Sequence, residues 1–424
     1  MTEVERRFAV FKTLHGDSPL RLRLILAADG LAAALAVSLP WSTSATGILA
    51  AAWLIAVLPT LEPAAVRRVL LTPAGGLPVV FWALGLAGVL WATGIPFDER
   101  LNGLSSFHKF LFIPLLIAHF ERSERGHWVL VGFLASCTAL AAVSWGLMAQ
   151  LGFRRDGSGI AAVPVKDYIA QSAELTFAAF LLAALAVRDW PTRGARAVLL
   201  IVLSIVFLLN VLIVTTSRTA LVALPFLFVL FAFTQLRLRW ATGLLIAGAA
   251  ATALVWSADP YVRNNVSSIV TEVREFKPEA DGTRAGERLE FWRKSVGIVQ
   301  DAPLIGHGTG SIREQFRVRA EGHSGMAGMV SANPHNQMLA VALQLGLLGV
   351  AVLFALWIAH LRLFIGSSLA AWAGLLVVSQ NFIGSLFNSH LFDFTHGWGY
   401  VIGVGVAGGV VLRGTADLMR GTRL

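Results

Sequence analysis

Charged residues and cysteine are both scarce in this sequence of 424 residues. Aspartate, glutamate, lysine and arginine together make up 14% of the chain, whereas 56% is hydrophobic and the mean hydropathy is +0.69. A soluble domain carries about 25% charged residues, so the composition excludes that class. Cys137 is the only cysteine, which excludes an intrachain disulfide and a cysteine-based metal site.

Three sequence patterns are absent as well. The segment Met1–Arg23 is charged and lacks a short apolar core before a cleavage site, so we expect no removable signal peptide. The net charge of +9 is not gathered into a basic patch interleaved with aromatics, so we expect no nucleic-acid partner. The paired, interrupted helices of a transporter built from inverted halves are not visible either.

Long apolar runs fill most of the chain, and a bilayer core about 30 Å thick needs roughly 20 apolar residues per spanning helix. We therefore expect an all-α integral membrane protein with about twelve transmembrane helices. Their predicted ranges are Leu24–Pro40, Ala45–Leu61, Gly76–Ile95, Phe110–Phe120, Trp128–Leu151, Tyr168–Val187, Ala195–Val214, Thr219–Gln235, Trp240–Trp256, Asn336–Leu361, Phe364–Leu386 and Phe394–Leu412. Phe110–Phe120 is short and contains Pro114, so a broken or re-entrant helix is the alternative there.

Arginine and lysine indicate which helix ends face the cytoplasm, because cytoplasmic loops retain positive charge. Every second connection is basic, as around Arg67, Arg188 and Arg237. The short loops on the other side hold few cations, namely Arg100, Lys109, Arg154, Arg155, Lys166 and Arg218. We therefore expect a bacterial inner-membrane protein with both termini in the cytoplasm.

One connection, residues 257–334, is long and polar and lies on the outer, periplasmic side of this topology. It divides the chain into residues 1–256 with nine predicted helices, the loop itself, and residues 335–424 with three more. Long loops in compact proteins are usually functional.

Within this loop, apolar residues recur at helical spacing in two stretches, Val262–Phe276 and Leu289–Val299. The spacing predicts two amphipathic helices near the membrane face. The glycines of Gly306–Gly310 then break the pattern.

Ionisable side chains near the outer helix ends are candidates for function, because charge at membrane depth is costly. Arg218 lies in a very short connection, and an interfacial arginine that reaches lipid headgroups is the alternative. Arg288 follows Arg284 by one turn on the same helical face, and a solvated face with glutamate partners is the alternative. His335 follows Pro334 at a predicted helix start, where a neutral imidazole accepts a proton or caps the helix.

Weaker candidates are Asp393, Lys109 and Arg155. Asp393 stands near the start of the last helix and either orients the histidine, binds an acceptor or is an ordinary helix N-terminal aspartate. Lys109 and Arg155 are candidates to contact phosphates. Ordinary contact with lipid headgroups is the alternative for both. No Asp-x-Asp pair occurs on the outer side and the loop histidines lack ligand spacing, so we expect no metal or other cofactor.

The order of these residues resembles a family pattern. His335-Asn336, nine residues, Gly346, two residues and Gly349 resemble the histidine–asparagine signature of the O-antigen ligase and polysaccharide-polymerase superfamily. Upstream, that family's arginine–tryptophan, proline–glycine-rich and serine–arginine elements are matched by Arg288, Trp292, Pro303, Gly306, Gly308, Gly310 and Ser217-Arg218-Thr219-Ala220. The likeness in motifs covers about Val211 to Val350.

The resemblance implies a GT-C-like, metal-independent glycosyltransferase whose donor is a glycan on undecaprenyl pyrophosphate. By the family pattern, Arg218 and Arg288 hold the pyrophosphate, and His335 takes the proton of an acceptor sugar hydroxyl in a displacement that inverts the anomeric centre. A guanidinium suits this role because its planar fork of donors matches phosphate geometry. Candidate substrate-binding residues are Asn336, Arg284, Lys109, Arg155 and Asp393.

The implied acceptor is the lipid A–core oligosaccharide, which makes an O-antigen ligase the expected activity, with membrane lipids around it. An O-antigen polymerase shares the donor but elongates a second lipid-linked glycan. A protein O-oligosaccharyltransferase shares the signature but typically carries a further outer domain, which we expect to be missing after the last predicted span. A small-anion transporter should place its key charges near the bilayer midplane instead of at one face.

Overall fold

The computed structural model describes residues 18–152, 162–215, 217–258, 260–280 and 282–421, and all secondary structure in these ranges is helical. The α-helices are α2 (Pro19–Ser38), α3 (Thr43–Val57), α4 (Pro63–Leu70), α5 (Pro73–Gly88), α6 (Phe97–His108), α7 (Phe112–Phe120), α8 (Gly126–Gln150), α9 (Tyr168–Asp189), α10 (Gly194–Leu209), α11 (Arg218–Gln235), α12 (Leu238–Ala258), α13 (Pro260–Arg274), α14 (Arg284–Asp301), α15 (Ile312–Ala320), α16 (Gln337–Leu363), α17 (Leu369–Ser385) and α18 (Phe394–Gly421). Shorter helical turns are η1 (Leu58–Thr60), η2 (Lys109–Leu111), η3 (Asn210–Thr215) and η4 (Gly325–Gly328).

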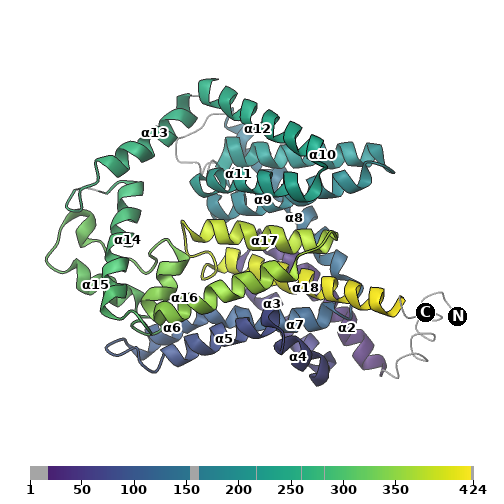
Figure 1. Ribbon diagram of the computed structural model, residues 1–424, viewed down its shortest axis with the longest axis horizontal. Helices are drawn as coiled ribbons and strands as arrows, with labels where there is room; N and C mark the ends of the chain where they lie inside the picture. Colours follow the sequence, from purple (N-terminus) through teal and green to yellow (C-terminus); the bar gives the residue numbers. More distant parts are fainter. Residues whose placement is uncertain (1–17, 153–161, 216, 259, 281, 422–424) are drawn as a thin grey trace.

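Most of these helices run along the long axis of the molecule, and the start of α2 and the end of α18 lie toward the same end of the bundle (Figure 1). At the opposite end, α13, α14 and α15 arch from α12 across to α16 (Figure 1). We call residues 260–334, which contain these three helices, the cap. Within the cap, α13 and α14 form at the two segments where the sequence predicts amphipathic helices, and α15 is a third helix that the periodicity did not predict.

Nine of the described helices are long and apolar enough to cross a membrane, and a bent pair makes a tenth candidate. The expected number was about twelve. The difference comes from two predicted segments that form helices but are not among the nine. Of these, α2 contains three charged residues, Arg21, Arg23 and Asp29, and α17 is short, with 17 residues. The protein is thus a multi-pass, all-helical membrane protein.

Two predicted boundaries are wrong. The segment before Phe110 was expected to be a loop, but α6, η2 and α7 form one helical span from Phe97 to Phe120. Its first turn carries Asp98 and Glu99, which suit the positive end of the helix dipole but hide the helix from a hydropathy reading. The span predicted as Gly76–Ile95 is α5, which begins earlier, at Pro73, and ends at Gly88; α4 precedes it at a bend of 83° between Leu70 and Pro73.

The glycine-rich segment of the cap is seated in a break of α16. Gly346 has φ 62° inside that helix, and the freed amides of Leu347 and Leu348 donate to the carbonyls of Pro303 and Leu304. A Cβ atom on Gly346 would lie 2.3 Å from the backbone of Leu304. The glycines therefore permit a backbone contact that joins the cap to α16.

Candidate functional site

His335 lies where the cap ends and α16 begins, and its backbone is held in an uncommon conformation. Its φ of 54° is in the left-handed region that few residues other than glycine adopt. The His335 amide donates to Asn333 Oδ1 at 2.8 Å, and Trp292 Nε1 of α14 donates to the His335 carbonyl at 3.4 Å. The imidazole stacks on Phe291 with ring centroids 5.9 Å apart. Backbone and ring are thus both positioned by neighbours, as expected of a functional side chain.

The hydrogen bond of the imidazole defines which nitrogen is available for chemistry. His335 Nδ1 lies 3.2 Å from Asn388 Oδ1. The same oxygen accepts from the Ser389 amide at 2.9 Å and from Asn333 Nδ2 at 2.9 Å, so it is an acceptor. Nδ1 must then carry the proton in the neutral ring, which leaves Nε2 with a lone pair.

The surroundings also favour a neutral imidazole. Burial lowers the pKa of His335 below its ordinary value, the positive charge of Arg288 lowers it further, and the hydrogen bond with Asn388 opposes both effects. A neutral ring with a free Nε2 is the form that accepts a proton.

Arg218 is placed by an irregular turn that the sequence did not predict. The last turn before it, η3, is a π-helix, a feature often found at functional sites. Buried amides fix this turn: Gln171 Nε2 donates to Asn210 Oδ1 at 3.0 Å, and Asn210 Nδ2 donates to Ser144 Oγ at 3.0 Å. Arg218 then begins α11.

Glu272 of α13 connects Arg218 to the cap. Arg218 Nη2 lies 3.8 Å from Glu272 Oε1, and Glu272 Oε2 accepts from the Ala285 amide at 2.8 Å in the first turn of α14. Arg288 lies one turn further along the same helix and is half-buried. Its charge acts on both His335 and His390. Glu272 was not singled out from the sequence, because an acidic residue on an exposed helix usually has no special role.

The structure places some of the weaker candidates, whereas two others fall outside its described part. Asn336 caps α16 by accepting from the Leu339 amide at 3.1 Å, and its Nδ2 donates to the Leu386 carbonyl at 3.1 Å. Arg284 begins α14, but its side chain is outside the described part of the structure, as is all of Arg155.

Asp393 does not orient His335, which was one of its expected roles. Its Oδ1 accepts from His396 Nδ1 at 2.7 Å and from the His396 amide at 2.9 Å. Lys109 Nζ donates to the Asp393 carbonyl at 2.7 Å and to the Phe392 carbonyl at 3.3 Å, which holds the same turn from the other side. His335 is instead oriented by Asn388, because Asn388 precedes α18 in a turn packed against the start of α16.

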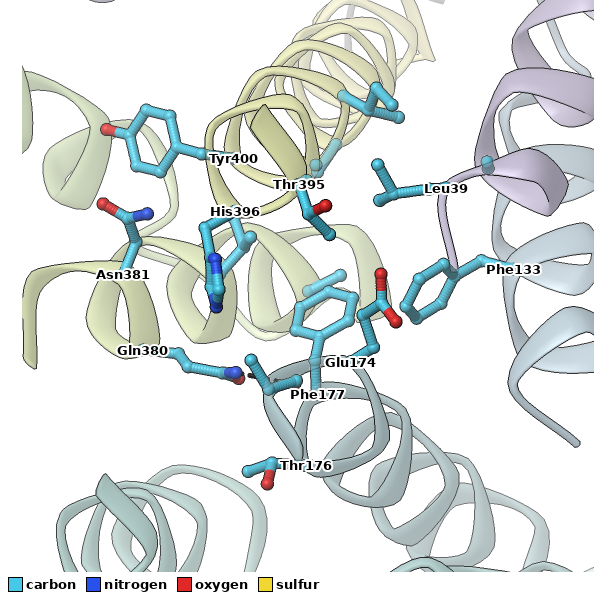
Figure 2. A pocket seen from close by; sticks show the side chains of 18 of the residues that line it. Leu39, Phe133, Glu174, Thr176, Phe177, Gln380, Asn381, Thr395, His396 and Tyr400 are labelled. Carbon is cyan, nitrogen blue, oxygen red and sulfur yellow. Dashed lines mark hydrogen bonds between the residues drawn. The ribbon is translucent and has the colours of Figure 1, made fainter. Parts of the chain in front are cut away.

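An apolar cavity of about 300 Å³ lies among α8, α9, α11, α17 and α18. Most of its lining is aliphatic or aromatic, and its polar groups include Glu174, Gln380, Asn381 and His396 (Figure 2). Figure 2 shows Glu174 on the same side as Phe133 and Leu39. An elongated apolar cavity with a polar end suits an amphiphile.

Comparison with known proteins finds one similarity. A search of curated proteins finds no match. Residues 203–354 match the family model described as O-antigen ligase. This range runs from α10 into α16 and contains Arg218, Arg288 and His335, the three residues that the sequence ranks first. The chain is therefore a multi-pass membrane protein in which residues 203–354 are similar to the O-antigen ligase family.

Proposed function

We propose that this protein transfers a glycan from undecaprenyl pyrophosphate to the lipid A–core oligosaccharide at the outer face of the bacterial inner membrane. The observation that carries the proposal is the state of His335. Its Nδ1 donates to Asn388, its Nε2 is free to accept a proton, and the charge of Arg288 acts on the ring. The family match over the same residues supports a glycosyl-transferring enzyme.

The reaction is a single displacement. An acceptor sugar hydroxyl loses its proton to His335 Nε2 while its oxygen attacks the anomeric carbon of the donor. The bond from that carbon to the phosphate oxygen breaks, and the pyrophosphate leaves with the bonding electrons. Arg218 and Arg288 hold the departing phosphate oxygens, which gain charge as the bond breaks. Attack opposite to the leaving group inverts the anomeric centre.

Arg218 forms an ion pair with Glu272. At 3.8 Å, with both side chains partly exposed, it is a weak contact that a pyrophosphate can displace. The isoprenoid chain of the donor would occupy the apolar cavity. Its lining includes Thr219 and Ala220, which directly follow Arg218.

An in-vitro transfer assay tests the proposal. Purified protein is mixed with an undecaprenyl-pyrophosphate glycan and lipid A–core, and the wild type is compared with His335→Ala, Arg218→Ala and Arg288→Ala. We expect glycan on lipid A–core with the wild type and a loss of at least about 100-fold in kcat for His335→Ala, the lower end of a general base's contribution. Thermal unfolding in detergent checks that each variant is folded.

The same assay separates the alternatives. Elongation of the lipid-linked glycan without transfer to lipid A–core would identify a polymerase, and transfer to a protein would identify an oligosaccharyltransferase. If neither occurs and the protein moves a small anion across vesicles, the ligase proposal is wrong.

A further inference from the structure

A second pair of histidines lies at one end of the apolar cavity, and the reaction described above does not use it. The rings of His390 and His396 stack with centroids 3.9 Å apart and planes 14° from parallel. Both residues line the cavity, and the Nε2 atom of each is buried without a hydrogen-bond partner. Only 4% of His390 and 9% of the His396 side chain are exposed. Buried polar atoms are usually paired, so two unpaired nitrogens at a cavity indicate a ligand.

His396 is the better oriented of the two rings. Asp393 Oδ1 lies 2.7 Å from Nδ1, which directs the opposite nitrogen, Nε2, away from that carboxylate. A Cβ atom on Gly384 would lie 2.2 Å from His390 Nδ1, so His390 is packed tightly against α17. Burial also holds the pKa of His390 well below its ordinary value, so this ring is neutral. His390 is therefore a fixed platform for the imidazole of His396.

This end of the cavity lies beside the proposed reaction centre. Gln337, two residues after His335, accepts from the Leu391 amide at 2.9 Å, next to His390. The charge of Arg288 acts on His390 as well as on His335. Thr219 and Ala220, the residues after Arg218, also line the cavity.

The cavity continues away from this end along α18. Its lining includes Thr395 near the start of that helix and Val410 near its end, 15 residues apart, which corresponds to about 22 Å of helix. Glycines and aliphatic side chains dominate this stretch. An apolar chain lying here would have its polar end at His396.

The charges nearby permit an anion at that end. Lys166 Nζ donates to Thr395 Oγ1 at 3.2 Å, and its charge acts on both Glu174 and Asp393. The acidic residue of the lining, Glu174, lies toward Phe133 and Leu39 in Figure 2, with Phe177 drawn between it and His396. A ring with a proton on each nitrogen would present one N–H to Asp393 and the other to the cavity.

We propose that His396 binds the phosphate that is attached to the isoprenoid chain of the donor. This inference rests on the proposed function and assigns the two phosphates to separate groups. Arg218 and Arg288 hold the phosphate next to the sugar, close to His335, and His396 holds the phosphate next to the chain. Asp393 is a positioning residue that acts through His396.

The test measures binding of three lipids to the purified full-length protein in neutral-lipid nanodiscs, without acceptor. The lipids are undecaprenol, undecaprenyl phosphate and undecaprenyl pyrophosphate. The variants are His396→Ala, His396→Gln, Arg288→Ala and, as a matched histidine control in the cap, His323→Ala, whose side chain is 54% exposed. Thermal unfolding of each variant is measured in the same nanodiscs.

We expect His396→Ala to weaken the binding of both phosphorylated lipids by about tenfold or more, which is the loss for one charge-assisted hydrogen bond. The affinity for undecaprenol should be unchanged. His396→Gln should restore part of the affinity, because its amide still donates. Arg288→Ala should weaken the binding of undecaprenyl pyrophosphate and leave the binding of undecaprenyl phosphate nearly unchanged. His323→Ala should bind all three lipids as the wild type does.

Three results would overturn the inference. His396→Ala could bind undecaprenyl phosphate as tightly as the wild type. Its affinity for undecaprenol could fall by the same factor as its affinity for undecaprenyl phosphate, which would indicate a packing role. Phosphatidylglycerol could compete with undecaprenyl phosphate on equal terms, which would indicate a general phospholipid-headgroup site. Failure of the proposed function is distinct, because it is measured as transfer to lipid A–core in the assay above and not as binding of the lipid.

Discussion

Replacing Asn388 with leucine tests whether the tautomer of His335 matters. Leucine has the same branching at Cγ but no acceptor, so Nδ1 of His335 loses its partner at 3.2 Å. The ring is then free to move its proton to Nε2, and that tautomer has no lone pair for the acceptor hydroxyl. Asn388 contacts the ring and not the substrate in this scheme, so it is a positioning residue.

The expected loss follows from the hydrogen bond that fixes the ring. An unsatisfied donor in a partly buried site costs about 1–3 kcal/mol. Since 1.36 kcal/mol corresponds to a factor of ten in rate, kcat should fall by about 5-fold to 150-fold. KM for the donor should stay nearly constant, because the pyrophosphate is held by arginine. The loss should not exceed that of His335→Ala.

Single-turnover transfer to lipid A–core measures these rates. The decisive comparison is a double-mutant cycle of Asn388→Leu with His335→Ala. If Asn388 acts through His335, the double variant should be no slower than His335→Ala alone. Asn388→Asp is the matched variant, because a carboxylate still accepts from Nδ1 but also favours the protonated ring. The rate of Asn388→Asp should recover at high pH. As the pH is lowered, its rate should begin to fall at a higher pH than the rate of the wild type does. Additive losses in the cycle, or a kcat of Asn388→Leu within twofold of the wild type, would refute this reasoning.

Three further predictions concern neighbouring residues. Arg288→Gln removes a charge that lowers the pKa of His335, so the acid limb of the kcat profile should move to higher pH; an unmoved limb would argue against this electrostatic coupling. Gly346→Ala should lower the free energy of unfolding by about 2–4 kcal/mol, because φ is positive and a Cβ atom would meet backbone at 2.3 Å. The control Gly414→Ala, with open space around it, should be neutral or stabilising by up to about 1 kcal/mol. Thermal unfolding measures both. Trp292→Phe keeps the ring but loses the 3.4 Å bond to the His335 carbonyl, so kcat should fall about 2-fold to 10-fold with unchanged donor affinity.

Hydropathy identified most of the membrane helices, because burial in lipid demands apolar residues whatever their neighbours are. It failed where local composition was mixed. The first half of the span Phe97–Phe120 has polar residues and was expected to be a loop, with Lys109 in it. Lys109 is buried because the carbonyls of Phe392 and Asp393, almost 300 positions later, accept from its ammonium. No local pattern signals such a partner.

The residue types of the candidate site were also readable in the sequence. Arg218, Arg288 and His335 stand out because charge at an apolar boundary is costly and because they match a family order. Their geometry was not readable. The turn before Arg218 depends on Gln171 and Asn210, two amides on different helices. Orienting His335, a role expected of Asp393, is done by Asn388.

The sequence by itself determined that this is a membrane protein, that its polar segment of residues 257–334 is exceptional, and which three ionisable side chains are candidates for chemistry. These properties are local, since they depend on hydropathy, spacing and residue type. The tertiary structure decided that Glu272 joins Arg218 to α14, that Asn388 selects the tautomer of His335, and that His390 and His396 close one end of an apolar cavity. Those relations depend on distances between residues far apart in the chain, which are defined only when the helices pack.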